Sequence, residues 1–152
     1  MTYTILLAED NEDDVFFFKT AAKKAGWAHN LHTVSNGREA IQSLKSYLAG
    51  DLPRLALVLL DMKMPFVGGL EVLEWAQTQP ELQMIPLVML TSSEQESDIE
   101  AAYRLGAASF LVKPSQSEKL LDLLRVIDAY WLNQNRLPAM RRELTAKPPS
   151  FS

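Results

Sequence analysis

Five short apolar runs, each followed by an amphipathic stretch of helical period, limit this 152-residue chain to very few folds. Alternation of this kind favours a parallel sheet whose crossover connections are helices that cover both of its faces. Right-handed crossovers reduce the remaining topologies further. We therefore expect an α/β protein with a doubly wound, five-stranded parallel sheet. The runs predict strands at residues 4–8, 31–34, 55–60, 87–90 and 109–112, and the stretches predict helices at residues 13–25, 37–49, 69–77, 94–105 and 116–132.

The pattern ends near residue 132, which predicts one domain at residues 1–132 and a C-terminal extension at residues 133–152. The extension contains three prolines and four basic residues and shows little apolar periodicity. About twenty such residues cannot bury a core of their own. We expect the extension to have no independent fold.

Composition excludes several classes of function. The formal net charge of −4 and the pI near 5.2 argue against a surface built to hold nucleic acid. The absence of cysteine excludes disulfides, thiolate metal ligands and cysteine nucleophiles. No apolar run approaches the roughly 20 residues needed to span a bilayer, and the N-terminus lacks the pattern of a signal peptide. We expect a cytoplasmic protein with neither nucleic acid nor membrane as a partner.

Acidic residues stand at the ends of two predicted strands. Glu9 and Asp10 follow the first strand, and Asp61 follows the third. The carboxyl ends of parallel strands meet at one edge of the sheet, where ligands bind in open α/β folds. Mg²⁺ prefers carboxylate and carbonyl oxygens and leaves room for a phosphate oxygen. The three acids therefore predict a Mg²⁺ site, with the backbone carbonyl of Lys63 as the most natural further ligand.

A hydroxyl and a lysine end two other predicted strands at the same edge. Thr91 follows the fourth strand, and Lys113 follows the fifth. Both can contact the oxygens of a phosphoryl group that reaches Asp61, and the chemistry is then in-line transfer onto the carboxylate to give an acyl phosphate. The metal and the lysine would neutralise charge on the transferred oxygens. Each residue alone has an ordinary structural explanation, as a helix cap or a surface side chain, so the prediction rests on their conjunction.

With these motifs, residues 2 to about 132 resemble the receiver domain of two-component response regulators. The resemblance is specific because four motifs occur in the right order on the right elements. It implies the flavodoxin-like, receiver-type (βα)5 fold. The matching motifs are Glu9-Asp10, Asp61-Met62-Lys63-Met64-Pro65 with Gly68-Gly69, Thr91-Ser92 and Lys113-Pro114.

The resemblance also implies a role for each matching residue. Asp61 is expected to be the phosphoacceptor, and Thr91 and Lys113 are expected to bind the phosphoryl group. The Lys113–Pro114 peptide bond is expected to be cis. Thr91 and Phe110 are expected to form a switch in which the threonine moves and the ring fills the vacated space; Phe110 is otherwise a core aromatic. The residues expected to hold Mg²⁺ are Glu9, Asp10, Asp61 and, through its backbone carbonyl, Lys63.

Apolar residues on helix surfaces suggest where partners bind. A helical wheel places Phe16 on the side of the first helix opposite to its buried face. The family uses this exposed side to dock its phosphodonor. The resemblance therefore implies a histidine kinase or a phosphotransfer protein as the partner at Phe16. The sequence at residues 130–132 resembles small receivers that pair with bacterial phytochrome kinases, which suggests a phytochrome-type sensor. The residues expected at a second surface, for a homodimer or an output partner, are Tyr103, Val126 and Tyr130.

These inferences converge on a single-domain response regulator that accepts a phosphoryl group on Asp61 from a histidine kinase. It would act as a conformational switch or a phosphorelay intermediate, with slow autodephosphorylation and no turnover of a separate substrate. A receiver-like interaction module that works without phosphorylation is the alternative. A Mg²⁺ phosphohydrolase of the haloacid-dehalogenase-like class would need an aspartate where Lys63 stands. No glycine-rich nucleotide-binding motif follows any predicted strand.

Overall fold

The predicted five-stranded parallel sheet is present, with the strand order β2-β1-β3-β4-β5. The computed structural model describes residues 2–52 and 54–138. The chain runs outward from β1 to β2 and then returns to β3, so the topological switch point lies between β1 and β3. The strands are β1 (Thr4–Ala8), β2 (Asn30–Val34), β3 (Leu55–Leu60), β4 (Leu87–Thr91) and β5 (Ser109–Val112).

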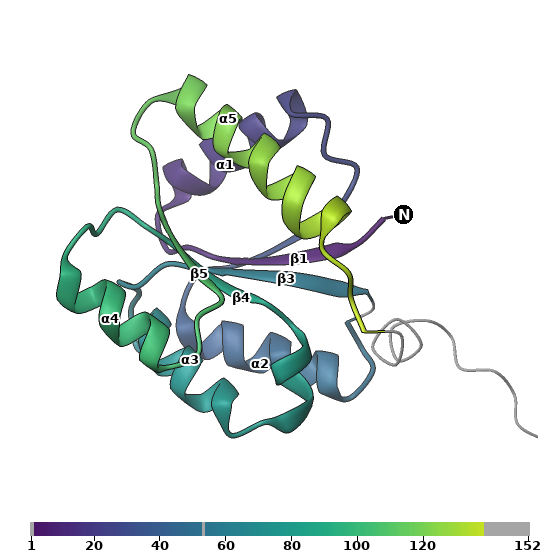
Figure 1. Cartoon of the computed structure of the whole chain (residues 1–152), viewed down its shortest axis with the longest axis vertical. Coiled ribbons are helices and arrows are strands. Elements are labelled where there is room, and N and C mark those ends of the chain that lie inside the picture. Colours follow the sequence, from purple (N-terminus) through teal and green to yellow (C-terminus); the bar gives the residue numbers. More distant parts are fainter. Residues whose placement is uncertain (1, 53, 139–152) are drawn as a thin grey trace, which may run out of the picture.

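Helices cover both faces of this sheet, with α1 and α5 on one face and α2, α3 and α4 on the other (Figure 1). The short 3-10 helix η1, which precedes β4, was not predicted. The helices are α1 (Glu12–Lys24), α2 (Gly37–Leu48), α3 (Gly69–Gln77), η1 (Pro80–Met84), α4 (Glu96–Arg104), α5 (Ser117–Ile127) and the π-helix η2 (Asp128–Gln134).

The position of β3 at the centre of the sheet explains why its sequence is continuously apolar. All six of its residues are buried, because the sheet is covered on both faces. Leu57 and Leu59 pack into the cluster beneath α1 and α5. Val58 and Leu60 pack into the cluster beneath the helices on the opposite face. The residue that follows β3 is therefore held at the rim of a rigid, fully packed strand.

Turn residues mark the start of α2 and the end of α4. The Asn36 side chain accepts the Glu39 N–H at 2.8 Å and begins α2, while Gly106, with φ of +95°, ends α4. At the start of α2, the Gly37 N–H donates to the Val67 carbonyl at 2.9 Å. A Cβ on Gly37 would lie 2.1 Å from that oxygen, so only glycine permits the approach. The contact joins α2 to the loop that follows β3.

The end of the last helix differs from the prediction of one helix over residues 116–132. The α-helix α5 ends at Ile127, and the π-helix η2 continues to Gln134. Near this change, the indole N–H of Trp27 donates to the Leu124 carbonyl at 3.0 Å. A side chain that bonds a helix carbonyl perturbs the backbone ladder, and Trp27 comes from the distant loop after α1. Local periodicity cannot reveal such a contact.

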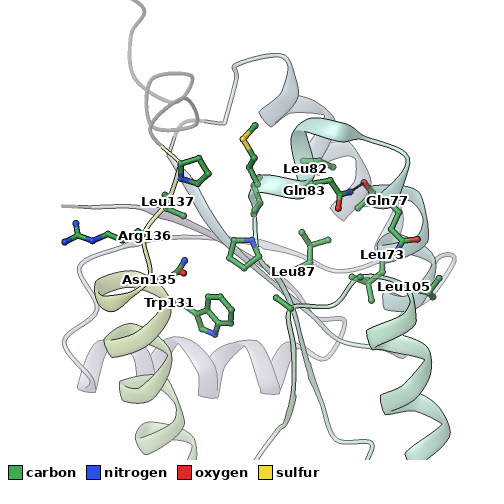
Figure 2. Close-up of a pocket in the computed structure, with 17 residues that line it drawn as sticks. Leu73, Gln77, Leu82, Gln83, Leu87, Leu105, Trp131, Asn135, Arg136 and Leu137 are labelled. Atoms are coloured by element: carbon green, nitrogen blue, oxygen red, sulfur yellow. Dashed lines mark hydrogen bonds between the residues drawn. The ribbon is translucent and has the colours of Figure 1, made fainter.

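A cavity of about 410 Å³ lies beside the start of β4, far from the carboxyl ends of the strands (Figure 2). Its walls include Leu87, Leu105 and Trp131, and Leu137 of the segment after η2 completes one side. The described residues that line it include no acid and no histidine.

The division between domain and extension at residue 132 stays a prediction, and residues 139–152 lie outside the described residues. Within the described part of the chain, no helix has the length and apolar character needed to cross a membrane.

Candidate functional site

Backbone hydrogen bonds fix the acids that follow β1 and β3. The Glu9 N–H donates to the Val34 carbonyl at 3.0 Å, and the Asp61 N–H donates to the Ala8 carbonyl at 3.1 Å. The parallel ladders thus continue one residue beyond the strands and hold both side chains at the switch point. Carboxylate oxygens of Glu9, Asp10 and Asp61 all lie within 4.8 Å of one another. The structure therefore brings the three predicted acids into one group.

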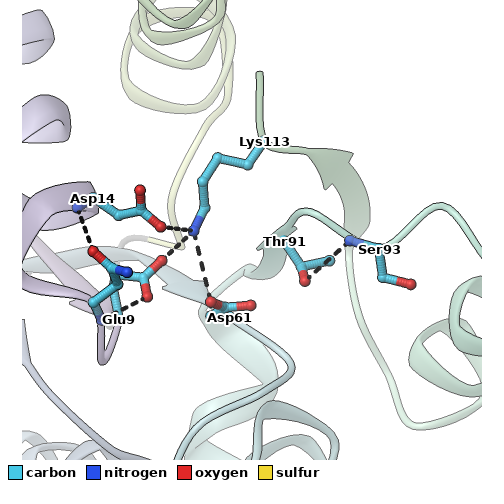
Figure 3. Close-up of polar contacts among 7 residues, drawn as sticks. Glu9, Asp14, Asp61, Thr91, Ser93 and Lys113 are labelled. Atoms are coloured by element: carbon cyan, nitrogen blue, oxygen red, sulfur yellow. Dashed lines mark hydrogen bonds and ion pairs between the residues drawn. The ribbon is translucent and has the colours of Figure 1, made fainter. Parts of the chain in front are cut away.

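Lys113 reaches this group from the end of β5 (Figure 3). Its backbone N–H donates to the Thr91 carbonyl at 2.7 Å, which anchors the residue beside β4. Its Nζ contacts Glu9 Oε1, lies 3.2 Å from Asp14 Oδ2 and lies 3.6 Å from Asp61 Oδ2. The one ammonium of Lys113 therefore forms ion pairs with three carboxylates.

Burial sets the electrostatics of the pair formed by Glu9 and Lys113. Loss of solvent, reinforced by the charge of Asp61, raises the pKa of Glu9 from 4.5 to about 7. The hydrogen bonds that Glu9 accepts from Lys113 and from the Asn11 N–H act in the opposite direction without cancelling the effect of burial. Burial alone would lower the pKa of Lys113, but the hydrogen bond to Glu9 and the charges of Asp61, Glu9 and Asp14 outweigh it and raise the pKa. The negative charge of the carboxylates at this site is therefore only partly neutralised by the one ammonium of Lys113.

The donor set of the acidic group fits a hard divalent cation. It consists of carboxylate oxygens alone, with Glu9 buried, Asp61 partly buried and Asp10 exposed. Such cations take oxygen ligands and retain water or substrate oxygens, which the exposed side at Asp10 allows. Lys63 lies in the adjoining loop with an exposed side chain. Its role as a carbonyl ligand stays a prediction.

Two glycines shape the end of the loop between β3 and α3, residues 61–68, and the start of α3. The Gly69 N–H donates to the Met62 carbonyl at 3.0 Å. A Cβ on Gly69 would lie 2.3 Å from the carbonyl oxygen of Asp61. A Cβ on Gly68 would lie 2.7 Å from the carbonyl oxygen of Met62. The Gly68-Gly69 pair therefore lets the loop fold tightly against the residue that ends β3.

Thr91 and Phe110 lie on the neighbouring strands β4 and β5. Thr91 is buried at the end of β4, and its Oγ1 accepts the Ser93 N–H at 3.5 Å (Figure 3). Phe110 is half-buried on β5 and packs against the core cluster beneath α3 and α4. Ser92 is exposed between Thr91 and the following loop. Their part in a switch is a prediction that this single conformation leaves untested.

One expectation from the resemblance is wrong for this structure. The peptide bonds of the described residues include no cis bond, so Lys113–Pro114 is trans rather than cis. The trans isomer is intrinsically favoured for bonds before proline by about 0.5–1 kcal/mol. It also accommodates both the Lys113 N–H bond to Thr91 and the contacts of Lys113 Nζ.

Asp14 belongs to this site, although its place there was not predicted from the sequence. Its carboxylate contacts the Lys113 ammonium, and it lies in the first turn of α1. Asp14 stands four residues before the buried Phe18, and residues with this spacing share one face of a helix. That spacing was an available signal. Asp14 is one of three consecutive acids at residues 12–14, and acids commonly occupy the first turn of a helix, so its acidic character did not distinguish it from its neighbours.

The residues predicted to meet partners are all on the surface. Phe16 is exposed on α1 and packs edge-on against Phe17, which is also exposed, with ring centroids 5.8 Å apart. Phe17 was not predicted and extends the apolar surface of α1. The exposed residues of the second predicted surface are Tyr103, Val126 and Tyr130.

Comparison with known proteins agrees with this geometry. Residues 5–125 match the family described as the response regulator receiver domain. The chain is 35% identical over 138 residues to the probable methanogenesis regulatory protein FilR2 of Methanothrix harundinacea, covering 90% of this chain and 88% of that protein. It is 33% identical over 138 residues to the response regulator Rcp1 of Synechocystis sp., covering 89% of this chain and 92% of Rcp1.

Solved structures give the same assignment. The phosphorylated cyanobacterial phytochrome response regulator RcpA superposes with a TM-score of 0.80 at 30% identity, covering 91% of this chain and all of RcpA. The Mn²⁺-bound form of Rcp1 superposes with a TM-score of 0.79, covering 90% of this chain and 99% of that structure. Sequence motifs, fold and relatives therefore agree, and the chain belongs to the response regulator receiver domain family of two-component signalling.

Proposed function

We propose that this protein is a single-domain response regulator that accepts a phosphoryl group from a histidine kinase on Asp61, in a Mg²⁺-dependent reaction. The observation that carries the proposal is the position of the Asp61 carboxylate. It lies in one group with Glu9 and Asp10 and 3.6 Å from the Lys113 ammonium. Receiver domains act in general as switches rather than as enzymes that turn over a separate substrate, and we propose the same here.

Each residue of the site would have its own role in the phosphoryl transfer. A carboxylate oxygen of Asp61 attacks phosphorus, the O–P bond forms as the N–P bond of phosphohistidine breaks, and the histidine nitrogen keeps the electron pair. Lys113 neutralises charge on the transferred oxygens, and the Thr91 hydroxyl donates to one of them. Glu9, Asp10 and Asp61 would hold Mg²⁺ with the Lys63 carbonyl. When bound, the cation supplies further charge neutralisation at the phosphoryl oxygens.

The switch would follow from the same contacts. Thr91 Oγ1 accepts only a long hydrogen bond of 3.5 Å, from the Ser93 N–H, which holds it weakly. Accepting that bond leaves the hydroxyl proton able to donate to a phosphoryl oxygen. Movement of Thr91 would leave space beside β4 for the Phe110 ring, whose tip is apolar and needs no hydrogen-bond partner. A local charge event would thus bias a two-state packing element.

Relatives and exposed side chains support the proposed partners. RcpA is described as a cyanobacterial phytochrome response regulator, which supports a phytochrome-type histidine kinase or a phosphotransfer protein as the donor. Phe16 and Phe17 present apolar surface on α1 for such a donor. We propose a cytoplasmic protein, with the receiver at residues 1–132, an extension at 133–152, and no nucleic-acid or membrane partner. The surface proposed for a homodimer or an output partner consists of Tyr103, Val126 and Tyr130.

Intact mass spectrometry tests the central proposal. Acetyl phosphate with Mg²⁺ should add about 80 Da to the wild-type protein, and peptide mapping should place the addition on Asp61. Chelation of Mg²⁺ should prevent the addition. A protein that gains no mass under excess donor would instead favour an interaction module that works without phosphorylation. A gain on another residue would overturn the role proposed for Asp61.

The pKa of Glu9 predicts how Mg²⁺ binding depends on pH. A cation requires the carboxylate, so between about pH 5 and pH 7 binding should release a proton, and affinity should rise with pH through this window. Without Mg²⁺, the folded protein holds this proton more tightly than the unfolded chain does. The free energy of unfolding of the metal-free protein should therefore fall as pH rises through the same window. Calorimetric titration in two buffers of different ionisation enthalpy measures the released proton.

Glu9→Gln is the control for this prediction. The variant lacks the titrating group, so its weaker Mg²⁺ binding should release no proton from this position. Equal proton release in the wild type and the variant would assign the titration to another group.

A further inference from the structure

The ammonium of Lys113 has a carboxylate neighbour that lies outside the acidic group. Glu9 and Asp61 belong to the group that can hold a cation, but Asp14 does not. Asp14 Oδ2 is nevertheless 3.2 Å from Lys113 Nζ, closer than the 3.6 Å that separates Nζ from Asp61 Oδ2. Lys113 is therefore held between α1 and the end of β3 (Figure 3).

The start of α1 fixes Asp14 in this position. The side chain of Asn11 accepts the Asp14 N–H at 3.0 Å and caps the helix. The Asp14 side chain is 41% exposed, whereas that of Lys113 is 16% exposed. Asp14 thus remains in contact with solvent while its carboxylate reaches inward to the more buried ammonium.

A bound cation would compensate the negative charge of some of these carboxylates and not of others. A bound divalent cation compensates the charges of Glu9, Asp10 and Asp61, but it leaves Asp14 uncompensated. Lys113 would then have two anionic partners, the carboxylate of Asp14 and the phosphoryl oxygens on Asp61. We propose that Asp14 competes with the phosphoryl group for Lys113, and that it is a positioning residue which limits how tightly the phosphoryl group is held. This inference rests on the proposed function of Asp61.

Free space beside Lys113 makes the exchange of partners feasible. A cavity of about 410 Å³ lies between α1 and α5, and Lys113 and Asp14 both line it with Phe17 and Leu120. Space on this side lets the ammonium swing between Asp14 and Asp61 without displacing packed core atoms. The competition therefore needs only a side-chain movement.

Beryllofluoride, which mimics the phosphoryl group on an aspartate, tests the competition at equilibrium. In saturating Mg²⁺, Asp14→Asn should bind beryllofluoride about threefold to tenfold more tightly than the wild type, because a carboxylate no longer competes for Lys113. Asp13→Asn is the matched control. Asp13 is the adjacent exposed aspartate in the same helical turn and is not among the three carboxylates that contact Lys113. It should change the affinity by less than about twofold, through net charge alone.

Two further variants separate the contact from a general effect on folding. Asp14→Glu keeps the carboxylate and should restore an affinity close to that of the wild type. In the metal-free protein, the changes in melting temperature caused by Asp14→Asn and Lys113→Met should be non-additive, because each removes the same contact. Those of Asp13→Asn and Lys113→Met should add.

The outcomes distinguish this inference from the proposed function. Wild-type protein that binds no beryllofluoride would overturn the proposed function and this inference together. Wild-type binding with equal affinities for Asp14→Asn and Asp13→Asn would overturn the competition alone. Weaker binding by Asp14→Asn would also overturn it, because Asp14 would then support the phosphoryl group instead of competing with it.

Discussion

Asp61→Asn should abolish the addition of a phosphoryl group and, at the same time, raise the melting temperature of the metal-free protein. The amide oxygen is a poor nucleophile, and no acyl phosphate can form on it, so acetyl phosphate should add no mass. The gain in stability follows from the crowding of carboxylates within 4.8 Å of one another at the switch point. Removing one charge relieves repulsion that a single ammonium, 3.6 Å from Asp61, only partly offsets.

The size of the change in stability can be bounded. A relief of about 1 kcal/mol corresponds to an increase of about 2–4 °C for a domain of this size. Mg²⁺ should raise the melting temperature of the wild type by mass action, and it should do so less for Asp61→Asn, which has lost a charged ligand. Thermal denaturation with a chelator and with Mg²⁺ measures both effects.

Asp51→Asn is the control for the change of net charge. Asp51 is exposed in the turn after α2 and does not belong to the acidic group. It should leave phosphorylation and melting temperature nearly unchanged. If metal-free Asp61→Asn melted below the wild type, repulsion among the carboxylates would not be what destabilises the metal-free site.

Gly37→Ala should destabilise the fold by about 2–3 kcal/mol, which is a loss of about 5–10 °C in melting temperature. The new Cβ would lie 2.1 Å from the Val67 carbonyl oxygen, the same oxygen that accepts the Gly37 N–H. Either this hydrogen bond breaks or the loop between β3 and α3 shifts. Because that loop also carries Lys63, Mg²⁺ affinity should fall as well.

Gly26→Ala separates this steric clash from simple backbone strain. Gly26 has φ of +77°, and a Cβ added to it would meet nothing within 4 Å, so alanine there suffers only the cost of the left-handed conformation. That cost is about 1–2 kcal/mol, and Mg²⁺ affinity should be unaffected. Chemical denaturation and calorimetry compare the two variants. A Gly37→Ala protein with unchanged Mg²⁺ affinity would show that the loop geometry does not govern the cation site.

The strands could be predicted closely because their signal is local. The boundaries of β1, β3 and β5 agree with the prediction, since each is a short apolar run ended by a polar residue. The end of the last helix could not be predicted. The α-helix gives way to a π-helix close to the Leu124 carbonyl, which bonds the indole of Trp27, a partner 97 residues away in sequence.

The location of the site could be predicted for a topological reason, and its details could not. Parallel strands end at one edge, so Glu9, Asp61 and Lys113 had to come close once the strands were recognised. Asp14 comes from a helix, and only the docking of α1 brings it to Lys113. The trans peptide before Pro114 contradicts an expectation that came from the resemblance alone.

The bond between the Trp27 indole and α5 provides an intrinsic optical reporter. The indole lies between two helices, donating to the Leu124 carbonyl and packing edge-on against the Phe18 ring at 5.7 Å. Any tilt of α5 against α1 changes the polarity around this fluorophore and so shifts its emission. In a variant with Trp75 and Trp131 replaced by Phe, which leaves Trp27 as the one tryptophan of the sequence, stopped-flow recording of that emission can time the helix response after donor addition without an attached dye.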